Sequence, residues 1–235
     1  MHFIDEKLNK ITMYRLVLYY LFGLLVCAVE FGFGGLLPYS PLAIVISTVI
    51  ITLACYLANL LFAYVFEVPA NVESLYITAL ILVFLITPIK SFYDADFYSL
   101  TIWASVLAMA SKYILAIRKK HIFNPAAIAV FITSYTLGLS ASWWVGTAWM
   151  LVPVLAGGLL LTRKLLRFDL VLSFFFASFA TVVVTNLSSP SLITVLERFF
   201  FASPVLFFAF VMLTEPLTTP PRRVLRIIYG AMVGV

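Results

Sequence analysis

The chain has 235 residues, of which 64% are hydrophobic and only 11% are charged, and its mean hydropathy is +1.12. Soluble domains are about one quarter charged, so this composition excludes a soluble globular protein and indicates that lipid is the main solvent. The net charge of +5 is divided into short clusters between apolar segments, which argues against a nucleic-acid-binding surface.

Long apolar segments follow one another along the whole chain, and within them apolar and polar residues do not alternate as they do in the strands of a barrel. Because every backbone polar group needs a partner in lipid, they predict an all-α polytopic membrane protein rather than a barrel. The nine segments are roughly 14–37, 41–66, 74–89, 97–117, 125–140, 146–162, 168–186, 194–213 and 224–235. The last would extend about 18 Å across a hydrocarbon core of about 30 Å. We therefore expect residues 1–235 to form a single transmembrane domain whose natural polypeptide continues past Val235.

The positions of the cations predict an orientation. The N-terminus "MHFIDEKLNK" is polar and has no small-residue cleavage site. If it lies in the cytoplasm, twelve of the fifteen Lys and Arg residues fall on the inner side, and only Lys90 and Arg198 fall outside. Positive residues concentrate on the inner side of membranes. We expect a multi-pass protein of the inner or plasma membrane with a cytoplasmic N-terminus.

An internal repeat is indicated by two of the segments. One begins near Glu73 and ends at Thr87-Pro88, and the other begins near Glu197 and ends at "LTEP". They lie five segments apart, so they would cross the membrane in opposite directions. This pattern predicts two inverted five-helix repeats with a site where the halves meet. Chance similarity between two apolar helices is the alternative.

The stretch "RKKHIFNPAAIAV" is the first polar cluster within the apolar sequence. Asn124 is a good N-cap and is followed by proline, so one interpretation is a cytoplasmic loop that starts a helix. The other is an anion site, formed by free N–H groups and the helix dipole, with positive charge from Lys112, Lys119 and His121. Lys112 lies about 9 Å along the preceding helix from this cluster, and its side chain either snorkels to the interface or faces the interior.

The stretch "LTEPLTTPP" is the second cluster and contains Thr214, Glu215, Thr218 and Thr219. One interpretation is an ordinary cytoplasmic loop. The other is irregular backbone that lines a cavity, because irregular backbone near a membrane is tolerated where protein buries it or where it lines a cavity. A third cluster, "SASWWVGTAW", is predicted to be an aromatic belt at the outer interface. We find no Cys or His spacing for a metal, and no P-loop or Gly-rich dinucleotide turn.

Several of these motifs together resemble a known family. Lys112 followed by "KHIFNPAA", then "WWVGT", "TRKLLRF" and "LTEPLTTPP", is similar to the NqrB/RnfD family of membrane electron-transport proteins, from about residue 70 onward. The resemblance implies a urea-transporter-like fold of two inverted five-helix repeats. It also implies a role in ion-translocating electron-transport complexes and a bound flavin.

One departure from the family concerns how the flavin is held. The family attaches FMN covalently to a threonine in a Ser-Gly-Ala-Thr motif, and this motif does not occur in the chain. We therefore expect non-covalent FMN or riboflavin. The chain looks more like short relatives in which this membrane module is joined to a C-terminal ferredoxin-reductase-like domain. The expected partners are the lipid bilayer, a soluble reductase domain or redox subunits, and quinone as a candidate acceptor.

The function that we expect is a membrane-embedded, flavin-binding electron-transfer module, which would be part of a flavin-dependent membrane oxidoreductase. One alternative is a small-solute or vitamin transporter or channel with the same inverted repeat. Another is a membrane anchor that docks a soluble reductase domain. The predicted flavin site lies at the Asn124 end of its helix, with the 214–219 loop as the facing wall. Its residues are Lys112, Lys119, His121, Asn124, Thr214, Glu215, Thr218 and Thr219.

Overall fold

The computed structural model describes residues 11–69, 71–117, 120–187 and 190–235, and almost all of its regular structure is helical. The chain divides into two compact units. The first unit is Val17–Trp144, and the second is Val145–Val235 together with residues 11–16. The boundary falls between the fifth and sixth predicted segments, where the sequence analysis also divides the two halves.

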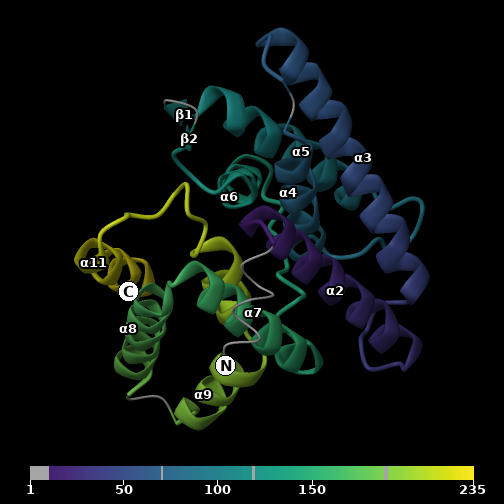
Figure 1. The fold of residues 1–235 in the computed structure, drawn as a ribbon. Coiled ribbons are helices and arrows are strands. Elements are labelled where there is room, and N and C mark those ends of the chain that lie inside the picture. The colour runs from purple at the N-terminus through teal and green to yellow at the C-terminus, as the bar shows by residue number, and fades with distance from the viewer. Residues whose placement is uncertain (1–10, 70, 118–119, 188–189) are drawn as a thin grey trace. The chain divides into compact units, whose positions relative to one another are not determined.

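The first unit contains five long or medium helices and one small hairpin (Figure 1). These elements are α2 (Met13–Phe33, whose first residues belong to the second unit), α3 (Pro41–Val65), α4 (Val72–Leu85), α5 (Ala95–Ile114), β1 (Ala116–Ile117), β2 (Lys120–His121) and α6 (Pro125–Leu137). Short polar side chains fix where four of the helices begin, because each accepts a hydrogen bond from the first turn. These N-caps are Ser40, Asn71, Asp94 and Asn124. Gly138 ends α6 with φ +68°, a conformation that favours glycine.

Helix α4 is the buried centre of the first unit. Its sequence is apolar on all sides, and every residue from Thr78 to Leu85 is buried. It packs against α3, α5 and α6. With 14 residues it extends about 21 Å, which is shorter than a bilayer core. Helix α4 is therefore a core helix covered by its neighbours rather than a lipid-facing one.

Helices α3, α4 and α5 alternate in direction along the chain. Asn59, near the end of α3, meets Tyr113, near the end of α5, while Ser47, near the start of α3, accepts a hydrogen bond from the Ile89 N–H that precedes α5. Helices α3 and α5 therefore run in the same direction. Lys112 of α5 bonds Ser74 in the first turn of α4, so α4 runs in the opposite direction. This order agrees with the alternation predicted for the second, third and fourth segments.

The second unit is built from two straight helices, a broken helix and a C-terminal helix. Its elements are η1 (Ala148–Met150), α7 (Leu151–Leu165), α8 (Phe168–Asn186), α9 (Leu192–Phe201), α10 (Val205–Phe207), the π-helix η2 (Phe208–Met212) and α11 (Arg223–Gly234). The predicted eighth segment is not one straight helix, because it bends by 44° at residues 202–204, where Pro204 interrupts the backbone hydrogen bonding.

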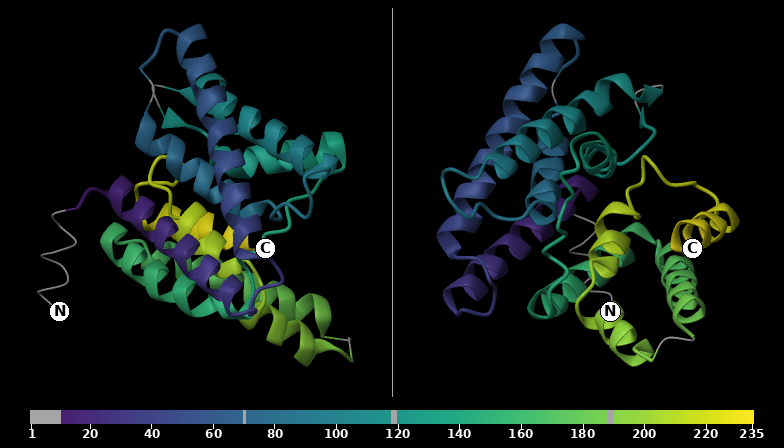
Figure 2. Two further views of the ribbon diagram at one scale, coloured as in Figure 1. Left: turned by 90° about the vertical axis from the view of Figure 1, so that its right-hand side faces the viewer. Right: turned by 180° about the vertical axis from the view of Figure 1, so that it is seen from behind.

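Glycines allow the closest helix contacts of the second unit. Helices α8 and α11 lie side by side (Figure 2). A Cβ at position 230 would collide with Ser173 Oγ and lie 2.6 Å from the Leu170 carbonyl oxygen, and one at position 234 would lie 2.6 Å from the Phe174 carbonyl oxygen. The spacing Gly230-x-x-x-Gly234 is the small-residue pattern by which membrane helices approach closely.

The helices are those of a multi-pass membrane protein. Among the described residues, four helical stretches are long and apolar enough to cross a membrane, and the bent pair of α9 with α10 and η2 gives a fifth. The four stretches are Met13–Phe33, Pro41–Val65, Ala148–Leu165 and Phe168–Asn186. Helices α4 and α6 are apolar but shorter. The nine-segment count is therefore not confirmed, and the inverted relation of the two halves stays a prediction.

Candidate functional site

Lys112 lies in the last turn of α5 and is turned into the first unit. Its Nζ donates hydrogen bonds to the Ser74 carbonyl oxygen at 2.8 Å and to Ser74 Oγ at 3.0 Å. Both contacts are partly buried. The amine thus lies against the first turn of α4, and the choice between a snorkelling and an interior side chain stays a prediction. Ionisable groups held inside a membrane domain are commonly functional.

His121 lies on β2, next to Lys112. The hairpin pairs Ala116 with His121 and Ile117 with Lys120, and so folds β2 back onto the end of α5. Burial, with the nearby positive charge of Lys112, lowers the pKa of His121 below its usual value of 6.5. His121 is therefore neutral at pH 7, and the expectation that it adds positive charge is wrong. It offers a hydrogen-bond donor and an acceptor instead.

Asn124 caps α6, and this cap occupies the donors that the sequence analysis expected to be free. Its Oδ1 accepts hydrogen bonds from the N–H groups of Ala126 and Ala127, both at 3.1 Å. The Ile128 N–H bonds the Asn124 carbonyl oxygen, and Pro125 has no N–H. The first turn of α6 thus has no free backbone donor, so the prediction of free N–H groups is wrong. Only the helix dipole remains to attract an anion there.

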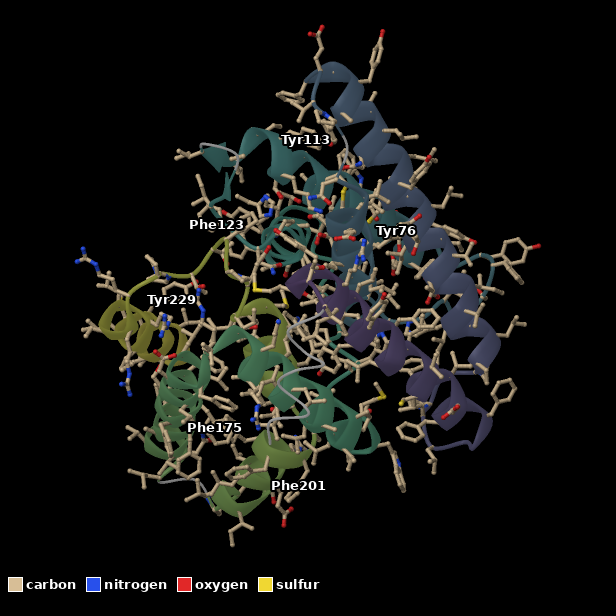
Figure 3. The ribbon with its side chains drawn as sticks, in the orientation of Figure 1. Tyr76, Tyr113, Phe123, Phe175, Phe201 and Tyr229 are labelled. Carbon is tan, nitrogen blue, oxygen red and sulfur yellow. The ribbon has the colours of Figure 1, made fainter. Side chains whose placement is uncertain are left out.

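Aromatic rings surround the same end of α3 and α5 (Figure 3). Tyr113, the residue after Lys112, stacks on Phe66 with ring centroids 5.6 Å apart and contacts Phe62 at 5.9 Å. The Tyr113 hydroxyl also donates to Asn59 Oδ1 at 3.0 Å. An amine, a neutral imidazole and flat rings therefore lie together at this end of the first unit. We call this group, formed by Lys112, His121, Tyr113, Phe62 and Phe66, the lysine end.

Polar groups without hydrogen-bond partners continue from the lysine end into the interior. Asn59 Nδ2, Thr101 Oγ1 and Ser105 Oγ are buried and have no oxygen or nitrogen partner among the described residues, although the weakly polar Cys55 thiol lies beside Ser105. Thr101, Ser105 and Lys112 fall on one face of α5, because their spacings of four and seven residues are close to whole helical turns. Hydroxyls in helices usually bond the carbonyl three or four residues earlier, as five others of this unit do. Thr101 and Ser105 make no such bond.

The 214–219 loop of the second unit directs its hydroxyls to its own backbone. Thr214 Oγ1 donates to the Phe210 carbonyl oxygen at 2.6 Å, and the hydroxyls of Thr218 and Thr219 both donate to the Glu215 carbonyl oxygen. Thr214 and Thr219 are buried. Glu215, Pro216, Leu217 and Thr218 are half-buried. The loop is thus partly covered by protein, and the cavity-lining interpretation stays a prediction.

The predicted site residues fall into two groups. Lys112, His121 and Asn124 belong to the first unit, where the hairpin connects the end of α5 to the start of α6. Thr214, Glu215, Thr218 and Thr219 belong to the second unit. Lys119 lies outside the described residues. The expectation that the two groups share one pocket stays a prediction.

Trp144 is buried, and it does not belong to an aromatic belt. Its Nε1–H donates to the Val83 carbonyl oxygen at 2.7 Å, and the Trp143 N–H donates to the Leu85 carbonyl oxygen at 3.0 Å. The last carbonyls of a helix lack partners within that helix. The tryptophan stretch therefore satisfies the C-terminus of the buried helix α4, and the belt interpretation is wrong for Trp144.

A groove with a volume of about 470 Å³ lies on another face of the first unit. It is lined by side chains of α3 and by one of α4, namely Thr48, Val49, Thr52, Leu53, Tyr56 and Tyr76. Its walls are mainly apolar, with tyrosines at positions 56 and 76. Tyr76 is two residues from Ser74, the partner of Lys112, so the groove lies close to the lysine end along α4.

Comparison with known proteins gives no relative to guide the assignment. No protein-family model matches the chain, and no curated protein matches it. The assignment of a function therefore depends on the residues themselves. Sequence reasoning missed Ser74, Asn59, Thr101 and Ser105, although one signal for the last two was present. The spacing of Thr101, Ser105 and Lys112 predicts a single polar face on an otherwise apolar helix.

Proposed function

We propose that the chain is a membrane-embedded electron-transfer module that holds a non-covalent flavin, FMN or riboflavin, at the lysine end of the first unit. The observation that carries this proposal is the position of Lys112, whose amine is held by two neutral oxygens of Ser74 beside a neutral His121. These bonds fix the position of the ammonium group near the imidazole.

The lysine end has the groups that a flat, electron-rich ring requires. Aromatic side chains such as Tyr113 and Phe66 stack on planar ligands. Neutral His121 brings an imidazole, with one donor and one acceptor nitrogen, to this end of the unit. A flavin accepts and donates electrons, and the protein supplies its position and its electrostatic environment. The charge of Lys112 would favour the reduced, more negative form, because a positioned cation stabilises developing negative charge in a site of low dielectric constant.

The same proposal assigns partners. A soluble reductase domain or separate redox subunits would deliver electrons, and a quinone would accept them. The groove along α3 and α4 supports a quinone as acceptor, since it is largely apolar and Tyr56 and Tyr76 offer hydroxyl groups. We place this module in the plasma or inner membrane with a cytoplasmic N-terminus, on the basis of the distribution of cations in the sequence.

The absorption spectrum of the purified chain tests this proposal. After purification with added FMN or riboflavin and removal of the excess, the protein should absorb between about 350 and 500 nm, and dithionite should bleach that absorption. Retention of FMN but not riboflavin would indicate that the phosphate is recognised. A protein that retains neither compound contradicts the proposal.

A small-solute transporter or channel is the second candidate function, and one observation favours it. The unpartnered groups Asn59 Nδ2, Thr101 Oγ1 and Ser105 Oγ lie inside a membrane unit, where an unsatisfied polar group is costly. A polar solute that passes between α3 and α5 would supply the missing partners. Uptake of a labelled solute by liposomes that contain the protein tests this function. Thr101→Val should reduce uptake if the passage exists, and unchanged uptake would contradict it.

A further inference from the structure

The arginines of the second unit form a cluster that the proposed flavin site does not use. Arg167 lies between α7 and α8, Arg222 and Arg223 lie at the start of α11, and Arg226 follows one turn later. We call these four residues the arginine cluster. It is the strongest concentration of one charge sign within the described part of the second unit.

The close packing of α11 on α8 builds this cluster. Gly230 and Gly234 allow the backbone of α11 to approach α8, and this contact fixes which side chains meet at the start of the two helices. Arg226 donates to both carboxylate oxygens of Asp169, with its shortest contact at 2.6 Å, and to the Pro221 carbonyl oxygen at 2.9 Å. Arg167 donates to the Pro220 carbonyl oxygen at 3.1 Å. Arg226 and Arg167 are therefore held in a defined geometry.

The cluster carries more positive charge than its carboxylates neutralise. Asp169 is the carboxylate that bonds Arg226, and Arg223 is also near enough for its charge to act on Asp169. Burial and the nearby Arg226 lower the pKa of Arg167. Glu215, the other carboxylate of this part of the unit, acts on Tyr229. Arg222 and Arg223 are exposed, and among the described residues no hydrogen bond or ion pair is made by their guanidinium groups.

The helix end beneath these arginines makes the charge excess unfavourable. Helix α11 has Arg222 at its N-cap without a side-chain cap, Arg223 in its first turn, and no acidic residue there. The N-terminus of a helix is its positive end and favours anions. The positive charges of Arg222 and Arg223 and the positive end of the helix repel one another, and an anion bound between the two arginines would relieve this repulsion. Below the arginines, apolar side chains of α11 are exposed, among them Val224 and Ile228.

Cations at one level and exposed apolar side chains directly below match the boundary between lipid headgroups and acyl chains. From this arrangement we infer that the arginine cluster binds the phosphate headgroup of an anionic phospholipid, with Arg222 and Arg223 as the main contacts. A lipid fits better than free phosphate, since its acyl chains would cover the exposed apolar face of α11 as well. The inference is independent of the flavin proposal, because it uses the second unit alone.

Lipid titration of the full purified chain in detergent tests this inference. Phosphatidylglycerol binding, measured by native mass spectrometry, should be stronger than phosphatidylcholine binding. The double variant Arg222→Gln and Arg223→Gln should bind phosphatidylglycerol roughly 30-fold more weakly, because each basic residue near a headgroup contributes about fivefold. The charge-conserving pair Arg222→Lys and Arg223→Lys should retain most of the binding, which separates loss of charge from misfolding.

The control removes the same amount of charge elsewhere. Lys90→Gln with Arg198→Gln changes two exposed cations outside the cluster and should leave phosphatidylglycerol binding unchanged. Inorganic phosphate at millimolar concentration should not displace the lipid. The inference is overturned if the arginine double variant binds phosphatidylglycerol like the wild type, if the control loses as much binding, if phosphatidylcholine binds equally well, or if phosphate alone displaces the lipid.

Discussion

The two units hold a partly buried cation in different ways. In the first unit, the Lys112 amine donates to a carbonyl oxygen and a hydroxyl, both of Ser74. In the second unit, the Arg226 guanidinium donates to both oxygens of the Asp169 carboxylate. The ion pair neutralises a charge and joins two helices, whereas the bonds to Ser74 orient the Lys112 amine toward the first turn of α4. The first arrangement suits a ligand site, and the second suits a structural clamp.

Hydroxyl groups within helices show a related difference. On α5 of the first unit, Thr101 and Ser105 lie on one face and leave their hydroxyls unpaired. On α8 of the second unit, Ser173 and Thr185 bond carbonyls three or four residues earlier. The contrast is limited to these helices, because Thr162 of α7 also lacks a partner. On α5, the hydroxyls of Thr101 and Ser105, which make no bond to a carbonyl of their own helix, thus lie on the face that leads to Lys112.

Removal of one partner of the Arg226–Asp169 ion pair should have the largest effect on the free energy of unfolding. Arg226→Met leaves the Asp169 carboxylate, whose side chain is only 10% exposed, without its partner. Breaking such a pair from one side should destabilise the protein by about 3 kcal/mol. Unfolding in detergent monitored by circular dichroism measures the effect. Arg198→Met, at an exposed position of the same unit, is the control. A change no larger than that of the control would show that the pair is not a clamp.

A side chain at Gly230 should separate α11 from α8. A Cβ there meets Ser173 Oγ and the Leu170 carbonyl oxygen, so Gly230→Val should cost about 2 kcal/mol through overpacking. Gly23 of α2 has no neighbour within 4 Å of a Cβ position, which makes Gly23→Val the matched control. Both variants are compared by the midpoint of thermal unfolding. Equal midpoints would contradict the close packing of the two helices.

A smaller effect is expected at the C-terminus of α4. Trp144→Phe keeps an aromatic ring but removes the N–H that bonds the Val83 carbonyl oxygen. The loss of this buried hydrogen bond should destabilise the protein by about 1 kcal/mol. Trp103, which is 51% exposed on α5 of the same unit, provides the control Trp103→Phe. If the two variants unfold alike, Trp144 does not cap α4.

The smallest effect is the pH dependence caused by His121. Its pKa is lowered in the folded protein, so the unfolded chain binds more protons below the unperturbed value of 6.5. The contribution of neutral His121 to stability should therefore be fully present above pH 6.5, and it should decrease as the pH falls from 6.5 toward the pKa of His121 in the folded protein. His121→Asn should remove this component of the pH profile of the unfolding midpoint. A variant with the wild-type profile would contradict the assignment.

The sequence predicts the positions of the helices well, and it predicts their packing poorly. Helix α8 (Phe168–Asn186) has the bounds expected from the apolar pattern, and Asn124 and Ser40 begin helices as short polar caps do. The bend at residues 202–204 was missed, although Pro204 is visible in the sequence. Apolar periodicity identifies a helical segment, but it does not indicate whether lipid or protein covers that segment.

The flavin site stays a prediction, and the sequence predicted the surroundings of its residues only in part. Lys112 and His121 do lie together, because a short hairpin folds the polar cluster back onto α5. The sequence did not predict that Asn124 would occupy its own helix N–H groups, nor that burial would keep His121 neutral. Hydrogen-bond partners and burial depend on the chain segments that surround a residue, which residue types and spacing do not specify.

The flavin content of the variant Lys112→Met tests the central claim most directly. The variant and the control Lys90→Met, which removes an exposed cation of the same unit, are purified with added flavin, and bound flavin per protein is measured by absorption. If Lys112 holds its charge for a flavin, Lys112→Met should lose most of the flavin, and Lys90→Met should retain the wild-type amount. Wild-type flavin content in Lys112→Met would contradict the account.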